Sequence, residues 1–225
     1  MTQEDIKMLT SSELFIGMNV TQISEALAST TYIERDVPAG QVVLTGDHPN
    51  RHMIIILSGS IDILMMDESG KSTIIDIVAA PNIVAPTFVT LQHHMPVNAI
   101  TRVDSRLAFI KPEDFKRLID NNMTVRWNYI HVMNQRCALL TDVIYFLTML
   151  SNKQKILLII RDEVRQQGSK TITLNFSRQG MASIMAVEKL TVKRCLHQLQ
   201  DEGIITVDGK QITVLNDQAL HFNYL

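Results

Sequence analysis

Hydrophobic and polar positions divide the chain into a central β-rich stretch with helical stretches on either side. From residue 32 to residue 110, short apolar or alternating runs are separated by turn residues such as Pro38-Ala39-Gly40 and Ser58-Gly59-Ser60. Runs of this length and spacing predict the strands of a sandwich or a barrel. We expect strands at residues 53–57, 61–65 and 73–78.

Helical patterns flank this β-rich stretch. Residues 4–28 carry apolar residues at helical spacing and predict an N-terminal helical cap. Lys111-Pro112 marks the start of another helix, because the fixed φ of proline suits the first turn. Residues 123–150 contain no glycine or proline, so we expect one long helix there.

The predicted long helix has two adjoining apolar rows. The first row has alternating spacings of four and three and consists of Met133, Cys137, Leu140, Ile144 and Leu147. The second row, which Arg136 interrupts, lies one position earlier and consists of Val132, Leu139, Val143 and Phe146. A helix with two apolar faces is buried on both. We expect one row to pack on the β-rich domain and the other on the same helix of a second copy; the alternative is the central helix of a monomer.

Residues 177–199 predict two short helices joined by a turn. Ser177 can cap the first helix, which ends near Met185, and the small Ala182 allows a close helix crossing. The second helix follows a turn at Ala186-Val187. It has an apolar face of residues at helical spacing, namely Val192, Leu196 and Leu199. Its opposite face carries Lys189, Lys193, Arg194 and His197.

Elements on either side complete a winged helix. Gly203 follows the second helix, where a helix C-terminus favours positive φ. Residues 204–215 predict strand, turn and strand around Asp208-Gly209. Upstream, Ser151 is expected to cap a further helix; that helix covers residues 153–167 and precedes a strand at residues 171–174. The second helix of a helix-turn-helix reads base edges in the major groove of DNA.

Charge is distributed unevenly between the two ends of the chain. The net charge at pH 7 is −2. Residues 151–225 hold ten Lys/Arg against seven Asp/Glu, whereas residues 1–150 hold eleven against sixteen. A basic C-terminal module on an acidic body is typical of a regulator that touches DNA at one end.

Composition argues against several other classes of protein. No apolar run reaches the ~18 residues of a membrane span, and the N-terminal residues lack the order of a signal peptide, so we expect a cytoplasmic protein with no membrane partner. Cys137 and Cys195 are too few for an iron–sulfur cluster or a structural zinc, and we expect both to be buried on helices. The sequence contains no recognisable nucleophile–base motif, so we do not expect an enzyme.

Four segments of the chain resemble one protein family. They are GQVVLTGD (40–47), ILSGSIDIL (56–64), FSRQGMASIMAVEKLTVKRCLHQLQDEGII (176–205) and DGK (208–210). With the order of the elements, they resemble the cyclic-AMP receptor protein/FNR (Crp/Fnr) family of bacterial transcription regulators over nearly the whole chain. The resemblance implies an α+β fold with three parts: a cyclic-nucleotide-binding-like β-barrel or jelly roll (1–122), a dimerisation helix (123–150) and a winged helix (151–225). It also implies a homodimer on a two-fold symmetric operator in double-stranded DNA, RNA polymerase as a further partner, and no cofactor.

The resemblance assigns DNA contacts to eight residues. Phosphate contacts fall on Ser177, Arg178 and Gln179, and a wing contact falls on Lys210. In the recognition helix Arg194 is retained and can bind guanine O6 and N7 together. Lys189 keeps a positive charge but lacks the guanidinium fork of arginine, and Lys193 adds a second positive charge. Leu190 replaces the family's usual glutamate. This change removes a contact to cytosine and allows an apolar contact to a thymine methyl. Ala186 stands where the family's turn usually has glycine; alanine would cost about 1 kcal/mol there if φ is positive.

The sensor segment departs from the family pattern. The family's cassette supplies a glutamate to the ribose and an arginine to the cyclic phosphate, but here Pro86 and Met95-Pro96 stand near these places. A buried phosphate without a charged or N–H partner is strongly disfavoured, so we expect either a small-molecule effector other than a cyclic nucleotide or none. The residues expected to line an effector pocket are Ala85, Pro86, Thr87, Met95, Pro96, Val97, Leu140 and Thr141.

Two alternatives stay open at this point. His93-His94 could belong to a metal or haem site, but neighbours on a strand point to opposite faces, and we expect two solvated loop residues and no metal. The protein as a whole could be an interaction module or a vestigial sensor whose winged helix no longer reads DNA.

Overall fold

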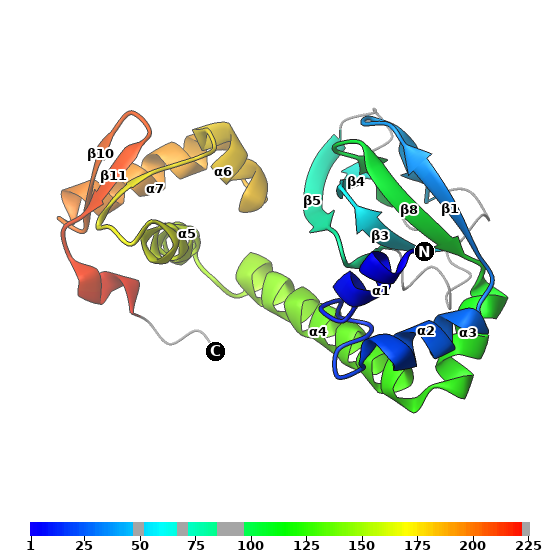
Figure 1. The fold of residues 1–225 in the computed structure, drawn as a ribbon. Helices are drawn as coiled ribbons and strands as arrows, with labels where there is room; N and C mark the ends of the chain where they lie inside the picture. The colour runs from blue at the N-terminus through cyan, green and yellow to red at the C-terminus, as the bar shows by residue number, and fades with distance from the viewer. Residues whose placement is uncertain (47–51, 67–71, 85–96, 222–225) are drawn as a thin grey trace. The chain divides into compact units, whose positions relative to one another are not determined.

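The chain consists of two compact units (Figure 1), Met1–Arg136 and Cys137–Leu225. The structure, a computed structural model, describes residues 1–46, 52–66, 72–84 and 97–221. The division between the units falls inside one long helix, α4, which spans Met123–Thr148. A single long helix over this stretch confirms the sequence-based prediction. The predicted domain boundaries at residues 122 and 150 stay a prediction.

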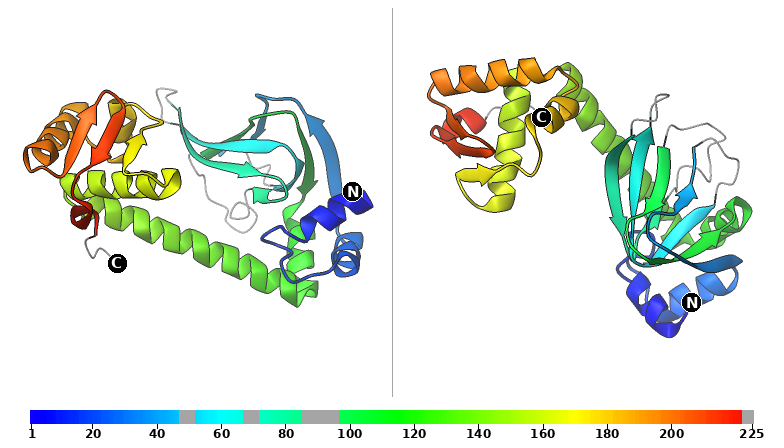
Figure 2. Two further views of the ribbon diagram at one scale, coloured as in Figure 1. Left: turned by 60° about the vertical axis from the view of Figure 1, so that its left-hand side comes forward. Right: turned by 90° about the horizontal axis from the view of Figure 1, so that it is seen from above.

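The β-rich part forms two antiparallel four-stranded sheets that face each other (Figure 2). The first sheet has the order β1 (Tyr32–Val37), β8 (Ser105–Ile110), β3 (Met53–Ser58) and β6 (Ile83–Val84). The second has the order β2 (Val42–Leu44), β7 (Val97–Thr101), β4 (Ser60–Met66) and β5 (Ser72–Ala79). Within the described residues the two sheets do not join at their edges. The domain is therefore a jelly-roll-like sandwich rather than a closed barrel.

Strand β3 is apolar along almost its whole length because its sheet is covered on both faces. Met53, Ile55 and Leu57 pack in one cluster with residues of helices α1 to α4. Ile54 and Ile56 point the other way and pack between the two sheets. This arrangement explains why the sequence around β3 lacks the alternation expected of a strand with one wet face.

Four helices accompany the sandwich: α1 (Gln3–Leu9), α2 (Val20–Ala28), α3 (Pro112–Asn121) and the first half of α4. Helix α3 begins at Pro112, as predicted. The N-terminal helical cap predicted over residues 4–28 is present as two helices, because turns follow the end of α1 at Leu9 and α2 begins after its own capping box. In that box Asn19 Oδ1 accepts from the backbone N–H of Gln22, and Gln22 Oε1 accepts from that of Asn19, both at 2.9 Å.

The second unit is a winged helix. Its elements are α5 (Asn152–Gln167), β9 (Thr171–Thr173), α6 (Arg178–Ile184), α7 (Lys189–Asp201), β10 (Ile205–Asp208), β11 (Gln211–Val214) and the 3-10 helix η1 (Asp217–Leu220). The three strands form one sheet in the order β10-β11-β9. Ala182, Val192 and Leu196 lie together in its core, which confirms the predicted crossing of the two short helices.

Local capping signals decide where these helices begin and end. Ser151 and Gln154 form a capping box at the start of α5, and Ser177 Oγ accepts from the N–H of Gly180 at the start of α6. Gly203 follows α7 with a φ of 66°, and the N–H of Ile204 donates to the carbonyl of Leu199 at 2.9 Å. These signals are local in sequence, so the winged helix could be predicted element by element.

The turn between α6 and α7 places an alanine in the left-handed region. Ala186 has a φ of 53°, and among the described residues it is the only one other than glycine with positive φ. The turn is held by the N–H of Val187, which donates to the carbonyl of Ala182 at 3.0 Å. The backbone therefore demands the conformation that glycine adopts without a steric penalty.

We expect Ala186→Gly to raise the free energy of unfolding of the winged helix by about 0.5–1 kcal/mol. Glycine removes the steric strain of the left-handed conformation, which stabilises the fold. The unfolded chain with glycine has more conformational entropy, which offsets part of that gain. Calorimetry on the full chain measures it. The matched control is Ala182→Gly, four residues earlier in a buried helical position, which should destabilise; a lower stability of Ala186→Gly would contradict the strain argument.

Candidate nucleic-acid interface and sensor residues

Helix α7 has one buried face and one exposed face. Val192, Cys195, Leu196 and Leu199 are buried against the winged-helix core. Burial raises the pKa of the Cys195 thiol, with an opposing effect from the charge of Lys153. The prediction that Cys195 is a buried small hydrophobe is therefore confirmed.

The exposed face of α7 carries cations without acidic partners. Lys189, Lys193 and His197 follow one another at i, i+4 and i+8 and are all exposed. Leu190, of which 51% is exposed, and Arg194 form the neighbouring stripe. In the part of the chain that the structure describes, no carboxylate lies within ion-pair distance of Lys189, Lys193 or Arg194. These three charges are available to an external anion.

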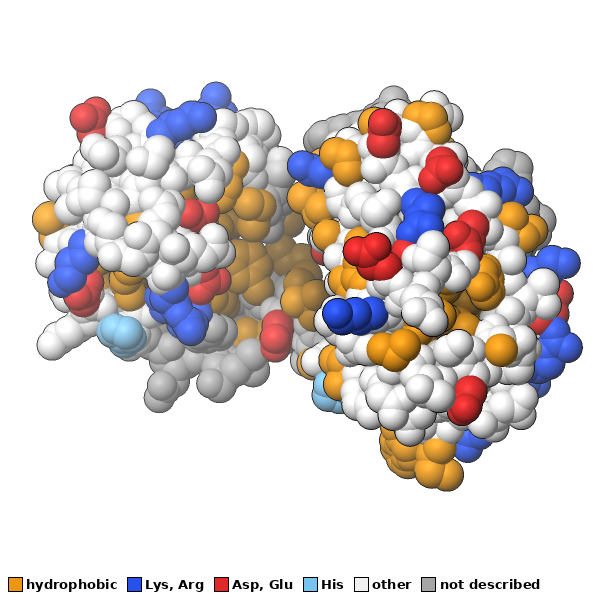
Figure 3. All heavy atoms as spheres, in the orientation of Figure 1, with side chains coloured by type: hydrophobic (Ala, Val, Ile, Leu, Met, Phe, Trp, Pro, Cys, Tyr) orange, Lys and Arg blue, Asp and Glu red, His pale blue; other side chains and the backbone are white. Residues whose placement is uncertain are grey.

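The other predicted DNA-contacting residues lie at two further places on the same unit. Ser177 and Gln179 are exposed at the start of α6, and Arg178 between them is half-buried. Lys210 is exposed in the tight turn between β10 and β11, where its carbonyl accepts from the N–H of Leu174 at 3.0 Å. Lys and Arg side chains lie along the upper edge of this unit in Figure 3.

The predicted effector residues are described only in part. Ala85, Pro86, Thr87, Met95 and Pro96, and also His93 and His94, lie outside the described residues. Val97 is half-buried at the start of β7 and packs against the cluster between the sheets. Leu140 and Thr141 are exposed on α4, where Thr141 Oγ1 donates to the carbonyl of Cys137 at 3.0 Å. The Thr141 hydroxyl is therefore used within its own helix.

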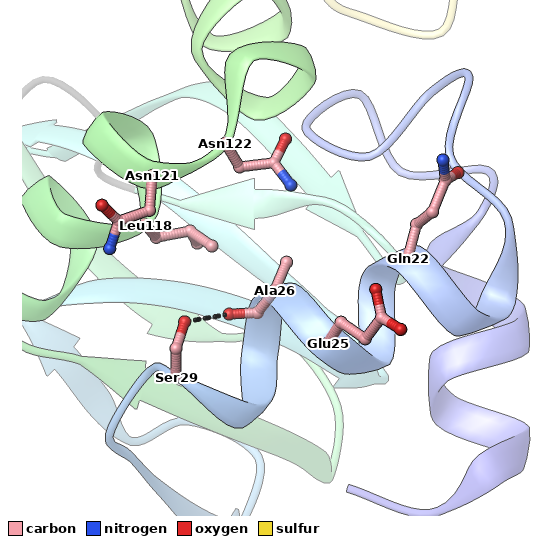
Figure 4. A pocket seen from close by; sticks show the side chains of 7 residues that line it. All are labelled: Gln22, Glu25, Ala26, Ser29, Leu118, Asn121 and Asn122. Carbon is pink, nitrogen blue, oxygen red and sulfur yellow. Dashed lines mark hydrogen bonds between the residues drawn. The ribbon is translucent and has the colours of Figure 1, made fainter.

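A small pocket of about 260 Å³ lies between α2 and α3 (Figure 4). Its lining is mostly polar and includes Gln22, Glu25 and Asn121. Part of this polar surface already serves the fold, because Gln22 belongs to the capping box of α2 and Asn122 Oδ1 accepts from the N–H of Val125 at 3.0 Å. None of the predicted effector residues lines this pocket.

Helix α4 exposes much of its apolar surface in the single chain. In the first row Met133 is half-buried, while Leu140 and Ile144 are each 61% exposed and Leu147 is also exposed. Cys137 is exposed as well, so the prediction that it is buried is wrong for the single chain. Figure 3 shows hydrophobic side chains over the stretch where Figure 1 draws the end of α4.

The second apolar row is covered only at its ends. Val132 is buried, and Phe146 packs against the winged-helix core. Leu139 and Val143 are exposed. Which of the two rows packs on the sandwich and which on a second copy stays a prediction. The middle of α4 presents both rows together as one broad apolar surface.

The exposed apolar surface of α4 also begins earlier than the two predicted rows. Met123 and Ile130 precede Cys137 and Ile144 by steps of seven residues, and both are exposed. Trp127, the only tryptophan of the chain, is exposed beside them. Extending the same heptad upstream would have found this part of the row; Arg126, which interrupts the companion position, concealed it.

Neither a metal-binding cluster nor a membrane-spanning helix is found among the described residues. No group of three or more His, Cys, Asp or Glu side chains is arranged to hold a metal ion there. No described helix combines the length and apolar character needed to cross a membrane.

Two family models match consecutive parts of the chain. The model described as "Cyclic nucleotide-binding domain" matches residues 34–122, and the one described as "Crp-like helix-turn-helix domain" matches residues 143–221. The first covers the sandwich and the second the winged helix. The chain belongs to the Crp/Fnr family of transcription regulators. The family resemblance seen in the sequence and the α+β, jelly-roll-plus-winged-helix fold are thereby confirmed.

Solved structures share this Crp/Fnr fold at low sequence identity. A crp/fnr-family transcriptional regulator from Eubacterium rectale is 16% identical, with a TM-score of 0.61 and coverage of 92% of this chain and 95% of that one. CprK complexed with OCPA is 16% identical, with a TM-score of 0.64 and coverage of 88% and 91%. The c-di-GMP responsive regulator CLP of Xanthomonas campestris is 18% identical, with a TM-score of 0.60 and coverage of 88% and 100%. No curated protein matches the chain.

Proposed function

We propose that this Crp/Fnr regulator acts in the cytoplasm as a homodimer that binds a two-fold symmetric DNA operator and works with RNA polymerase. The observation that carries the proposal is the exposed face of α7, where Lys189, Lys193 and Arg194 have no acidic partner among the described residues. An uncompensated cationic stripe on the second helix of a winged helix suits entry into the major groove.

Base reading is assigned to the centre of this face. Arg194 is exposed and can donate two hydrogen bonds to guanine O6 and N7, which is the commonest specific contact in this groove. Leu190 beside it offers an apolar surface to a thymine methyl. Lys189 and Lys193 supply charge without the planar fork of arginine.

We assign contacts with the DNA phosphate backbone to residues on either side of the recognition helix. Ser177, Arg178 and Gln179 lie at the start of α6, and Lys210 lies at the tip of the wing. Side chains and free N–H groups at such positions hold phosphates and so set the register of the recognition helix. These residues should contribute to affinity on all sequences.

A salt titration of DNA binding tests this function against the alternative of a vestigial winged helix. Binding through neutralised phosphates makes the logarithm of the affinity fall linearly with the logarithm of salt concentration. Duplexes selected from random DNA supply the ligand. The absence of any selected sequence, together with a flat salt dependence, would support the alternative and contradict the proposal.

The dimer interface is assigned to the first apolar row of α4. Met133, Cys137, Leu140, Ile144 and Leu147 form a seam with the four-three spacing of a coiled coil. The large exposed side chains of this seam are unfavourable in a monomer, and pairing with a second copy would remove them from water. Two-fold pairing of α4 would also present two recognition helices to two half-sites.

The effector is proposed to be a small molecule other than cyclic AMP or cyclic GMP. Solved neighbours differ in this respect, because CLP is described as responsive to c-di-GMP and CprK was solved with OCPA. Proteins with this fold therefore do not all respond to the same effector. Pro86 and Met95-Pro96 stand near the places of the family's acid and arginine, and with Leu140 and Thr141 they remain candidate lining.

We expect neither cyclic AMP nor cyclic GMP to bind at physiological concentrations. Loss of a charge-assisted contact to a buried phosphate removes roughly 2–5 kcal/mol, which turns a micromolar site into one of about millimolar strength or weaker. Arg102 does not replace the missing arginine, because its Nε already donates to Asp62 Oδ1 at 2.7 Å. Isothermal titration with each nucleotide measures the affinity; a dissociation constant below about 10 μM would overturn the prediction.

A further inference from the structure

Lys155 is a buried lysine at the junction between α4 and the winged helix. Only 5% of the residue is exposed, although it lies in the first turn of α5. Its ammonium Nζ donates to the carbonyl of Leu147, in the last turn of α4, at 2.8 Å. The same ammonium lies 5.8 Å from the centre of the Phe146 ring.

These contacts join two helices that the chain connects by only three residues, Met149 to Ser151. The last carbonyls of a helix lack partners within it and carry partial negative charge, so a cation there is favourable. Phe146 packs at the same time against the winged-helix core. Lys155 therefore holds the end of α4, including its seam residue Leu147, on the unit that carries the recognition helix.

Simple stability does not account for a lysine at this position. Burying an ammonium opposes folding, and one carbonyl with one aromatic ring is a small set of partners for it. An apolar side chain of equal length would fill the same space beside Phe146, and replacing buried charges by apolar groups is often neutral or stabilising. What the apolar substitute lacks is a directional bond to the end of α4.

We infer that Lys155 is a positioning residue that fixes the angle between α4 and the winged helix, and through it the separation of the two recognition helices in the dimer. This inference rests on the proposed function, a homodimer on two half-sites. A fixed angle makes affinity depend on half-site spacing, because only one separation lets both recognition helices enter the groove together. Without the bond the two winged helices should accept a wider range of spacings.

The test compares Lys155→Met with Lys153→Met in the full-length dimer. Lys153 is the matched control: it lies two residues earlier on α5, and its Nζ bonds the exposed Glu202 at 2.6 Å, away from α4. Each protein is titrated with duplexes that contain the selected palindrome, the same half-sites moved apart or together by one base pair, or a single half-site. Lys155→Arg, which restores a donor and a charge, serves as the rescue.

We expect wild type and Lys153→Met to prefer the selected spacing by at least about tenfold, and Lys155→Met to lose most of that preference with single half-site affinity unchanged. Lys155→Arg should recover part of it. The melting midpoint of Lys155→Met should stay within a few degrees of wild type. A wild-type spacing preference in Lys155→Met, or an equal loss on the single half-site, would overturn the inference.

Amide exchange provides a readout that does not depend on DNA. We expect the amides of residues 147–151 to exchange at least about tenfold faster in Lys155→Met than in Lys153→Met, because the junction opens locally more often. Equal exchange in the two variants would overturn the inference. If wild type fails to prefer the palindrome over one half-site, the proposed function fails, while the exchange data still decide whether Lys155 holds the junction.

Discussion

Replacing Arg194 with alanine is expected to lower operator affinity and to relax the preference at one base pair in each half-site. A bidentate arginine–guanine contact contributes ~1–3 kcal/mol of discrimination. A dimer loses it twice, about 2–6 kcal/mol when the half-sites act independently, which corresponds to a fall in affinity of roughly 30-fold or more. The fold should be unaffected, because Arg194 is exposed and makes no ion pair with the described residues.

Arg178→Ala is the matched control for base reading. Arg178 lies at the start of α6, where a phosphate contact would act on every sequence equally. Selection from random DNA with wild type and both variants separates the two roles. The expected result is an altered profile for Arg194→Ala and an unaltered profile with weaker binding for Arg178→Ala. Identical profiles for wild type and Arg194→Ala would contradict the base-reading role.

The double variant Leu140→Glu/Ile144→Glu is expected to be a folded monomer. Both side chains are mostly exposed in the single chain, so the change should leave the fold of each unit intact. In a paired α4 the dimer would lose four buried apolar side chains at ~1.5–3 kcal/mol each and gain four facing carboxylates. Even half of the apolar contribution raises the dissociation constant by roughly 10²–10⁴-fold.

Sedimentation of the double variant measures the change in mass. His131→Glu/Ala138→Glu serves as the control, because both residues are exposed and lie about half a turn from the seam at 100° per residue. Oxidation gives a second measurement: Cys137 is exposed at a seam position and should cross-link two copies across the two-fold axis. Cys195 is buried and should not. A double variant that remains dimeric would place the interface elsewhere.

Signals that are local in sequence predicted the winged helix almost completely. Ser151, Ser177 and Gly203 mark helix ends through hydrogen bonds to residues within five positions, and the periodicity of α7 separates its buried and exposed faces. The exposure of Lys189, Lys193 and Arg194 follows from the same pattern, whereas the assignment of DNA contacts rests on the family resemblance. The family resemblance pointed to positive φ at Ala186, since the family's turn usually has glycine there, and the structure has a φ of 53° at this residue.

Signals of the same kind left the outcome open where two structures share one local pattern. Apolar spacing over residues 4–28 does not mark where one helix ends and the next begins, and the capping box of Asn19 and Gln22 sets the start of α2. Strand length and turn spacing fit both a barrel and a sandwich, and the choice depends on whether distant edges pair. Cys137 and Cys195 both lie on helices, but only Cys195 is buried in the single chain.

The sequence by itself determined the elements, their order and the cationic face of α7, since each rests on periodicity and caps within a few residues. Only the tertiary structure decided which apolar rows of α4 are covered, because coverage depends on surfaces far away in the chain. It also decided the environment of Lys155. A lysine in the first turn of a helix is ordinarily solvated, and only the tertiary structure buries Lys155 and brings its ammonium to the carbonyl of Leu147.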